Sequence, residues 1–571
     1  MVIDYLREAG STFLFGVPGT SEIPLIDGAA APGSGLTYVP CLHENIAVGA
    51  AMGFARMTGR PGAVQLHATP GIAHALGNLY NAFTARIPLV VLCGQQHSGL
   101  LVQEPLLASD LVAAARQYSK WAHEVRDARE LAVVMQRAFK EALAPPTRPV
   151  FISLPWDVLL TPVSDPGTAR ITRVGSRFIG AAQSIAAAAT VLAGAYSPVI
   201  IAGDEVGASG AWNELAVFAD QLGAPIYGEP AGSYQNCPPG LPHFRGELAL
   251  SQAAAHEQLR GHDAILLCGM NYPSQVLLFD SAAEMPLAPV PAQVHLHSDP
   301  WELGKNAYAA AAILGDVQTT LPQLGRAVAR DPLFNALLAS RRTAAIYREG
   351  AAIRDQRADR TAQLLSYTEN EPVHGSHVAA MLATLQPQLP VPMVFVNESF
   401  ADAPAFRDLL SFDDPVSYFC VPGSSLGFSM PASIGIKLAV GDSRVVVDVV
   451  GDGSALFYPQ AWWTAARLSL PVLTIVMNNR AYQTLESGVG QLDQLYQWRP
   501  GSDPWYLRLD DPPVRFVEVA AGFGIDGLSV TYLSDLREAL IKGLDVVLGG
   551  RPYVIEVLIG PDKTIRASIS H

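Results

Sequence analysis

A rhythm that occurs three times along the chain limits its fold more than any other feature. Each copy has a short run of β-branched apolar residues, a glycine turn, an alanine-rich amphipathic stretch and a second apolar run. The copies span residues 63–94, 197–230 and 443–479. This order is typical of strand–helix–strand units. The strands are nearly continuous in apolar residues rather than alternating, which indicates parallel sheets buried on both faces. We therefore predict an α/β protein with three tandem doubly wound parallel-sheet domains.

A chain of 571 residues is also too long to fold around one hydrophobic core. The strand–helix–strand pattern is interrupted by a stretch rich in Pro, Thr, Gly and Arg near 161–178. It lapses again in a charged segment at 341–371, which we interpret as an exposed connecting helix. The predicted domains are an N-terminal domain at 1–165, a middle Rossmann-like domain at 178–335 and a C-terminal domain at 370–565.

Composition and charge exclude several classes of function. No run approaches the roughly 20 apolar residues that span a bilayer, and the N-terminus lacks the layout of a secretory signal, so we expect a cytoplasmic protein without membrane contact. The five cysteines are scattered, which argues against structural zinc and a disulfide framework. A formal charge of −14 without dense Lys/Arg runs argues against nucleic acid as a partner. A small-molecule substrate is the better expectation.

The sharpest functional signal lies at the ends of two predicted strands, Gly451-Asp452-Gly453 and Asn478-Asn479. The glycines let backbone N–H groups approach a phosphate at a helix N-terminus. A right-handed crossover brings both strand ends to the same edge of the sheet. Two oxygen ligands there, together with phosphate oxygens, suit Mg²⁺. Taken separately, each end could be an ordinary turn; together they predict a metal and diphosphate site.

This pattern resembles the GDG…NN signature of the thiamine-diphosphate-dependent enzymes. The resemblance implies thiamine diphosphate as the cofactor, with Mg²⁺, or Ca²⁺ or Mn²⁺ in its place, bound by Asp452, Asn479 and the backbone oxygen of Ala481. It makes the N-terminal domain the pyrimidine-binding domain and the C-terminal domain the diphosphate-binding domain. The residues expected to hold the diphosphate are Gly451, Gly453, Ser454 and Tyr482.

Glu44 opens an Ala/Gly-rich helix in the segment LHENIAVGAAMGFA. In this family a carboxyl group in a dry pocket pairs with N1′ of the aminopyrimidine, so the resemblance implies that Glu44 binds and activates the cofactor. Such a helix could pack closely against a partner. Taken alone, a glutamate in a first helical turn merely complements the helix dipole.

Within the family, the chain resembles the benzoylformate decarboxylases in the order and spacing of segments such as FGVPGTSEIPL, QLHATPG, ALGNLYNA and LGFSMPASIG. The resemblance implies that Thr20 contacts the substrate carboxylate, that His67 is a catalytic histidine handling protons, and that Leu426 wedges the cofactor into a bent shape. The apolar pocket walls that it implies are Leu106, Leu107 and Leu485. Each residue has a structural alternative: Thr20 as a helix N-cap, His67 as a structural histidine, and the leucines as core residues.

The substrate pocket departs from the family pattern. Val276 stands at the place of a second active-site histidine, and we interpret the nearest alternatives, His295 and His297, as structural residues of the following strand. Thr484 replaces a small apolar residue and Gly488 a large aromatic one, which predicts a roomier and slightly more polar pocket.

Three further departures concern the cofactor side. Phe400 and Ala401 stand where hydroxyl residues contact the diphosphate, and His74 stands where an asparagine is usual. The segment 488–511 is longer than the family pattern and rich in Trp and Tyr. It forms either a lid or a loop that packs on a neighbouring subunit.

From these features we expect a non-oxidative decarboxylase of a benzoylformate-like, aromatic or bulky 2-oxo acid, giving an aldehyde and CO₂. The missing second histidine leaves open a carboligase or lyase of the benzaldehyde-lyase or acetolactate-synthase type, with an acceptor aldehyde. A remote alternative is an inactive thiamine-fold binding subunit, although the retained Glu44, His67, Asp452 and Asn479 argue against it. The resemblance also implies a homo-oligomer, most simply a dimer of dimers, whose cofactor spans two subunits, and no FAD.

Overall fold

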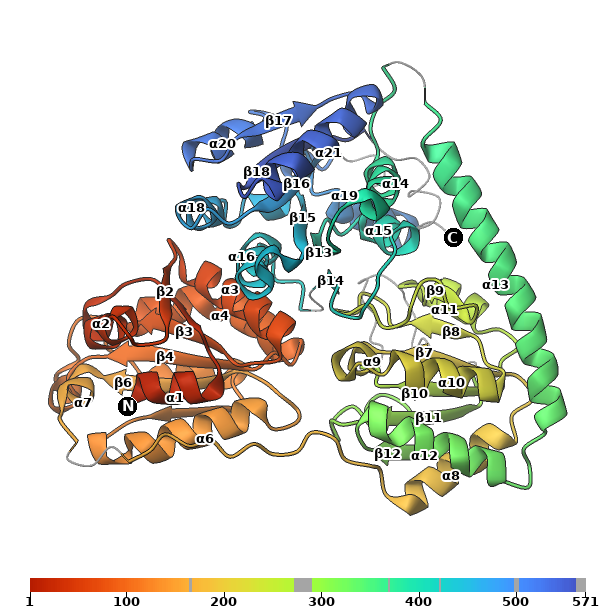
Figure 1. The fold of residues 1–571 in the computed structure, drawn as a ribbon, viewed down its shortest axis with the longest axis horizontal. Coiled ribbons are helices and arrows are strands. Elements are labelled where there is room, and N and C mark those ends of the chain that lie inside the picture. The colour runs from red at the N-terminus through yellow and green to blue at the C-terminus, as the bar shows by residue number, and fades with distance from the viewer. Residues whose placement is uncertain (164–166, 272–289, 368–369, 421–422, 498–502, 561–571) are drawn as a thin grey trace.

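A computed structural model describes residues 1–163, 167–271, 290–367, 370–420, 423–497 and 503–560. They form three six-stranded sheets, and every strand pairing between the named strands is parallel (Figure 1). The predicted α/β architecture of three doubly wound parallel sheets in tandem is therefore confirmed. No helix in the described part of the chain is long and apolar enough to cross a membrane.

The first sheet has the strand order β2-β1-β3-β4-β6-β5. Its strands are β1 (Phe13–Gly16), β2 (Thr37–Pro40), β3 (Gly62–His67), β4 (Leu89–Gln95), β5 (Trp121–Glu124) and β6 (Val150–Pro155). Helices α3 (Glu44–Thr58) and α4 (Ala68–Thr84) share one core with it, while α1 (Val2–Ala9), α2 (Ile23–Ala30) and α6 (Leu131–Leu143) share another. Both faces of the sheet are thus covered, which explains its almost uninterrupted apolar strands.

The middle sheet has the order β12-β11-β10-β7-β8-β9, so the strand order reverses between β7 and β10. Its strands are β7 (Pro198–Ala202), β8 (Ile226–Gly228), β9 (Phe244–Glu247), β10 (Ala264–Cys268), β11 (Ala292–His297) and β12 (Ala311–Leu314). Its main core contains α8 (Ala182–Ala193), α10 (Trp212–Leu222) and α12 (Val317–Arg330), and α11 (Gln252–Gln258) packs into a smaller one.

The third sheet has the order β14-β13-β15-β16-β18-β17. Its strands are β13 (Met393–Glu398), β14 (Tyr418–Phe419), β15 (Val445–Gly451), β16 (Val472–Asn478), β17 (Gly527–Val530) and β18 (Tyr553–Leu558). Helices α16 (Ser429–Val440), α18 (Ala461–Arg467) and α20 (Phe516–Gly522) share one core, and α14 (Gly375–Leu385), α15 (Ala403–Leu409) and α21 (Leu533–Leu548) share the other.

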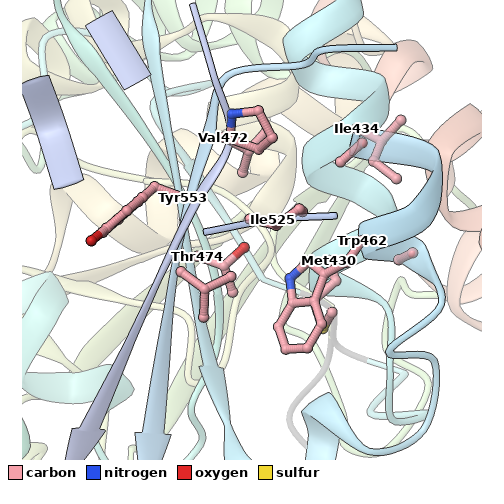
Figure 2. Close-up of a pocket in the computed structure, with 11 residues that line it drawn as sticks. Met430, Ile434, Trp462, Val472, Thr474, Ile525 and Tyr553 are labelled. Atoms are coloured by element: carbon pink, nitrogen blue, oxygen red, sulfur yellow. The ribbon is translucent and has the colours of Figure 1, made fainter. Parts of the chain in front are cut away.

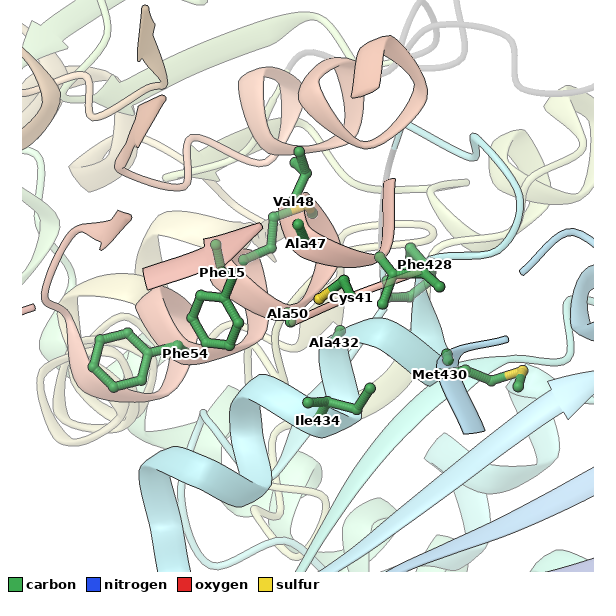
Figure 3. Close-up of a cluster of buried hydrophobic side chains, with 14 of the residues drawn as sticks. Phe15, Cys41, Ala47, Val48, Ala50, Phe54, Phe428, Met430, Ala432 and Ile434 are labelled. Atoms are coloured by element: carbon green, nitrogen blue, oxygen red, sulfur yellow. The ribbon is translucent and has the colours of Figure 1, made fainter. Parts of the chain in front are cut away.

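The first and third sheets meet through α3 and α16, whose buried residues belong to one continuous core (Figure 3). Glycines make this approach possible. A Cβ on Gly53 would overlap with the carbonyl oxygen of Ala432, and one on Gly435 would overlap with that of Ala50. The Ala/Gly-rich character of α3 therefore does serve close packing, and its partner is a helix of the same chain.

The segments between the sheets differ in kind. The charged segment forms α13 (Ala336–Leu364), a mostly exposed helix that runs along the middle and third sheets (Figure 1). It confirms the expected connecting helix. Between α7 (Trp156–Leu160) and α8, the described residues contain no helix or strand.

Candidate active site

His67 ends β3 and lies at the carboxyl edge of the first sheet. Its Nδ1 is 2.9 Å from Oε2 of Glu22, whose side chain is buried. Burial raises the pKa of Glu22 to about 7, while the nearby His67 lowers it. Glu22 was not singled out from the sequence, although it lies in the segment FGVPGTSEIPL. Its carboxyl group fixes the orientation of the imidazole and leaves Nε2 for a reacting group.

Gly19 lets the chain pass directly beside His67, because a Cβ on Gly19 would overlap with the His67 ring. The next residue, Thr20, therefore lies near His67. Thr20 is exposed and begins the short 3₁₀ helix η1 (Thr20–Glu22), whose N-cap is Gly19. The N-cap alternative for Thr20 is therefore wrong, and a contact with substrate stays a prediction.

Glu44 is the first residue of α3, and its side chain is only 10% exposed. Its Oε2 lies 3.1 Å from Nδ1 of His74, which extends from α4. Burial raises the pKa of the Cys93 thiol in β4 well above its usual range, and the charges of Glu22 and Glu44 raise it further, so both carboxyl groups lie near the same part of the sheet. The sequence placed His74 in this region but gave no reason for it; the structure makes it the neighbour of the expected activating glutamate.

The loop that carries Leu106 and Leu107 lies against residues that follow β3 and β4. The carbonyl oxygen of Leu107 accepts the Thr69 hydroxyl at 2.6 Å, and that of Leu106 accepts Nε2 of Gln96 at 2.8 Å. The Leu106 side chain is 82% exposed in the single chain. It is therefore not a core residue here, which is compatible with its predicted place in a pocket wall.

Asp452 follows β15, and its carboxylate Oδ1 accepts the backbone N–H of Gly453 at 2.8 Å. Oδ2 is buried without a hydrogen-bond donor among the described residues. Burial raises the pKa of Asp452 to about 6, and the backbone N–H groups of Gly453, Arg480 and Ala481 lower it. The turn after β16 thus lies beside Asp452. A buried carboxylate oxygen that lacks a donor fits a hard cation.

The remaining residues of this turn are arranged around the same point. Asn479 accepts the Ala481 N–H on Oδ1 at 2.9 Å and donates to Gln483 through Nδ2. A Cβ on Gly453 would overlap with the ring of Tyr482, so a glycine is required there. Gly451 ends β15, and Gly453 and Ser454 are buried in the short helix α17 (Asp452–Ala455).

Leu426 is half-buried and immediately precedes a set of backbone N–H groups that bind Glu398. The carboxylate of Glu398, at the end of β13, accepts from Gly427 at 2.6 Å, Phe428 at 2.9 Å and Ser429 at 2.8 Å. Burial raises the pKa of Glu398 to about 7, and the three backbone N–H groups lower it. Glu398 is the central residue of an Asn-Glu-Ser motif at 397–399, and its contact with the turn after Leu426 was not predicted from the sequence.

Five of the eleven non-glycine residues that have positive φ in the described part of the chain lie beside these residues. Non-glycine residues adopt positive φ next to His67, in the pocket loop, after the Asn-Glu-Ser motif, before Leu426 and after Asn479. They are Ala68 (φ 45°), Leu107 (φ 70°), Phe400 (φ 42°), Ser424 (φ 56°) and Arg480 (φ 58°). Such conformations cost about 1–3 kcal/mol each and concentrate at functional sites, which is consistent with a site built from the first and third sheets.

Helix α19 (Gln483–Tyr496) follows the turn at Asn479 and includes the start of the aromatic segment 488–511, which then returns towards this turn. Leu507 accepts the Tyr482 N–H at 2.8 Å, and the Leu509 N–H donates to Arg480 at 2.7 Å. Residues 498–502 lie outside the described part. Thr484, Leu485 and Gly488 lie on α19; Thr484 is exposed and Leu485 is 55% exposed. The choice between a lid and a subunit contact stays open.

The position of the second histidine, Val276, lies outside the described residues. His295 and His297 are fully buried in β11. His295 Nε2 pairs with the carbonyl oxygen of Met270 at 3.0 Å, and His297 Nδ1 accepts the Asp299 N–H at 2.8 Å. Both are structural, as the sequence indicated.

An internal cavity in the third sheet's core is a different feature. Figure 2 shows it between α16, α18 and strands β16 and β18, with Met430, Trp462 and Tyr553 on its walls. Its volume of ≈ 10 Å³ matches about one water molecule, so it is no cofactor site.

The chain belongs to the thiamine pyrophosphate (thiamine diphosphate) enzyme family, because three family models match along it. They are the N-terminal TPP binding domain at residues 1–114, the central domain at 185–324 and the C-terminal TPP binding domain at 405–557. The two TPP binding domains contain Glu44 and His67, and Asp452 and Asn479, respectively. They support thiamine diphosphate as the cofactor.

Comparison with individual proteins shows which enzymes of this family the chain is similar to. The chain is 31% identical to benzoylformate decarboxylase of Pseudomonas aeruginosa, with 98% of each chain covered. It is 26% identical to the acetolactate synthase isozyme 3 large subunit of Escherichia coli, over 98% of this chain and 94% of that one. Among solved structures, the 4-hydroxybenzoylformate decarboxylase of Rhodococcus jostii superposes with a TM-score of 0.81 at 28% identity, covering 98% and 99%. The protein is thus a thiamine-diphosphate-dependent enzyme related to benzoylformate decarboxylases and acetolactate synthases.

Proposed function

We propose that this enzyme is a non-oxidative decarboxylase of an aromatic or bulky 2-oxo acid, releasing CO₂ and the corresponding aldehyde. One observation carries the proposal: an oriented imidazole, His67 held by the buried Glu22, lies at the same sheet edge as Glu44. An oriented proton donor and acceptor is what product release from a decarboxylase needs. An inactive binding subunit would have no use for it.

Each group of residues in the candidate site has its own proposed role. When bound, thiamine diphosphate supplies the nucleophilic carbon and the electron sink. Asp452, Asn479 and the carbonyl oxygen of Ala481 would hold Mg²⁺, and Gly451, Gly453, Ser454 and Tyr482 would surround the diphosphate. Glu44 would hold a proton at the aminopyrimidine, and Leu426 would support the cofactor from one side. His67 moves protons at the substrate carbon and Thr20 binds the substrate carboxylate. Leu106, Leu107, Thr484, Leu485 and Gly488 line the substrate end.

The residues at the usual dinucleotide-binding position of the middle domain disfavour a bound flavin. Dinucleotides bind doubly wound sheets where the strand order reverses, here at the ends of β7 and β10. Arg86 of the first sheet's domain already occupies that region, where it binds Asn271, Asp299 and Glu302. Glu205, in helix α9 (Asp204–Ser209) after β7, accepts the Ser298 N–H. Acidic groups there disfavour an anionic diphosphate.

A carboligase is the second candidate. The 26% identity to an acetolactate synthase subunit favours it, as does Val276 at the place of a second proton donor. If protonation of the decarboxylated carbon is slow, that carbon can attack a second aldehyde in place of a proton, which forms a C–C bond and gives an acyloin.

The deciding experiment is an endpoint product analysis by mass spectrometry. Purified protein is incubated with thiamine diphosphate, Mg²⁺ and benzoylformate, with and without acetaldehyde, and Glu44→Gln serves as the control. Benzaldehyde as the main product supports the decarboxylase. Acyloin as the main product with acetaldehyde transfers the assignment to the carboligase. No turnover despite bound cofactor would contradict benzoylformate as the substrate.

A further inference from the structure

Three metal-ligating side chains gather at the start of α3, apart from the turn that carries Asp452. They are His43, Glu44 and His74, and one ligand atom from each lies within 4.8 Å of the others. Among the described residues, this is the one group of three His, Cys, Asp or Glu side chains that meets this geometry. The family pattern has asparagine at residue 74, so the second imidazole belongs to this chain's own sequence.

The ligand set suits zinc or a similar transition metal. Two imidazoles and one carboxylate form the His₂Glu set that Zn²⁺ accepts, whereas Mg²⁺ prefers oxygen ligands alone. The 3.1 Å between His74 Nδ1 and Glu44 Oε2 is near the roughly 3.3 Å that separates two ligands of a tetrahedral zinc ion with bonds of about 2.0–2.1 Å. A bound ion would replace the proton that these two atoms share.

The backbone holds the ligands in place. Asn45, next to His43 and Glu44, accepts the Asn78 N–H on its side chain at 2.8 Å and the Asn78 amide on its carbonyl oxygen at 2.8 Å. These two hydrogen bonds fix the start of α3 against α4, which carries His74. The His43 ring lies 5.2 Å from the His74 ring, centroid to centroid. Positions fixed in this way lower the cost of assembling a metal site.

One adjustment is required, and an entry path exists. Nδ1 of His43 accepts the Asn45 N–H at 3.1 Å, so a metal at this nitrogen displaces one hydrogen bond of about 1 kcal/mol. The His74 side chain is 55% exposed, which leaves room for the ion and for a water as fourth ligand.

We propose that His43, Glu44 and His74 bind one divalent transition-metal ion of the zinc class. Because the ion takes the carboxylate of Glu44, it competes with activation of the cofactor and inhibits the enzyme. Only this inhibitory consequence rests on the proposed function; the binding itself does not.

The test is a Zn²⁺ titration of chelator-stripped protein without cofactor, in excess Mg²⁺, against a chromophoric zinc chelator. We expect one tight equivalent whose affinity falls at least about tenfold in His74→Asn and in His43→Asn. Asp452→Asn should retain it. His97→Asn should also retain it, since His97 and Asp157, 3.9 Å apart, form a pair to which the described residues add no third His, Cys, Asp or Glu ligand. Unchanged zinc affinity in His74→Asn, or no tight equivalent in the native protein, overturns the proposal.

A spectroscopic measurement guards against misfolded variants. Co²⁺ added to the native protein should give the visible absorption of a four-coordinate nitrogen- and oxygen-ligated ion, and His74→Asn should lose it while keeping its circular dichroism. A spectrum of an octahedral ion in the native protein counts against the site. Saturating thiamine diphosphate with Mg²⁺ should displace the zinc. If zinc instead binds the cofactor-loaded enzyme in the same His74-dependent way, the metal site stands and the proposed role of Glu44 fails.

Discussion

At the scale of single residues, the Glu22–His67 pair is the feature with the clearest chemical meaning. A buried carboxyl group that faces one nitrogen of an imidazole sets the tautomer of the ring and directs the other nitrogen outward. Gly94 is required for this arrangement, because a Cβ there would overlap with the Glu22 carboxylate. The pair therefore depends on a glycine of the neighbouring strand as well as on its own two residues.

Replacing Glu22 by glutamine tests its orienting role. The amide is nearly isosteric but can no longer hold the imidazole as a negatively charged partner. We expect Glu22→Gln to lower kcat/KM for the accepted 2-oxo acid by roughly 10- to 100-fold, because oriented acid–base groups contribute about 10²–10⁴ to rate. Steady-state kinetics measures this. Cofactor affinity should stay within about threefold of the native value, and an unchanged kcat/KM would contradict the role assigned to His67.

At the scale of elements, the contact between α3 and α16 connects the two ends of the candidate site. Helix α3 begins with Glu44, and α16 begins just after Leu426. Asn81 of α4 strengthens the connection, since it donates to the Ser425 carbonyl oxygen at 2.8 Å and accepts the Ser425 N–H at 3.0 Å. Any change that separates the helices should therefore alter cofactor binding as well as stability.

A single added methyl group should disturb this contact. Gly53→Ala places a Cβ against the backbone of Ala432, and backbone cannot move aside as a side chain can. We expect a loss of about 1–3 kcal/mol in stability, typical of overpacking, together with weaker cofactor binding. Thermal unfolding and cofactor titration measure the two effects. The control is Gly28→Ala in α2, where only the Ile3 side chain lies near. Equal Tm values for both variants would exclude close packing as the reason for Gly53.

The turn after Leu426 offers a second test at this scale. Three backbone N–H groups converge on the Glu398 carboxylate, and glutamine would present an N–H₂ group to at least one of them. We expect Glu398→Gln to weaken cofactor binding by about tenfold or more, because hydrogen bonds to a charged group contribute about 1.5–3 kcal/mol. Equilibrium titration with thiamine diphosphate and Mg²⁺ measures it. Glu518→Gln, an exposed glutamate paired with Arg515, is the matched control and should bind normally.

At the scale of the whole molecule, buried carboxyl groups should govern how stability depends on pH. Burial raises the pKa of Glu22, Glu205 and Glu398 to about 7 and that of Asp448 to about 8. In the unfolded chain such groups lose their protons near pH 4. Between these values the folded state holds more protons, so its stability falls as pH rises. Histidines with lowered pKa, such as His297, act in the opposite direction, but only below about pH 6.5.

The native protein should therefore have a lower Tm at pH 8 than at pH 6.5. Each of these carboxyl groups contributes up to about 1.4 kcal/mol per pH unit within its window. Asp448→Asn removes the group with the highest of these pKa values, so its Tm should change less between the two pH values. Thermal scans of both proteins in buffers of equal ionic strength measure this. Identical shifts in the two proteins would show that Asp448 does not titrate in this range.

The sequence by itself determined the class of fold and the central residues of the candidate site. The nearly continuous apolar runs specify strands buried on both faces, and right-handed crossovers then bring Asp452 and Asn479 to one sheet edge. The glycines and alanines of α3 likewise predicted that this helix packs closely against another. These features were accessible because a local pattern of residues determines each of them.

Only the tertiary structure decided the pairings between elements. Glu22 meets His67 across 45 residues, His74 meets Glu44 across 30, and Glu398 meets Gly427 across 29. No local period encodes such contacts, since they depend on which strand ends become neighbours and on which glycines leave room. The same holds for α16 as the partner of α3. Sequence fixes which groups each element carries, and packing of the three sheets decides which of them touch.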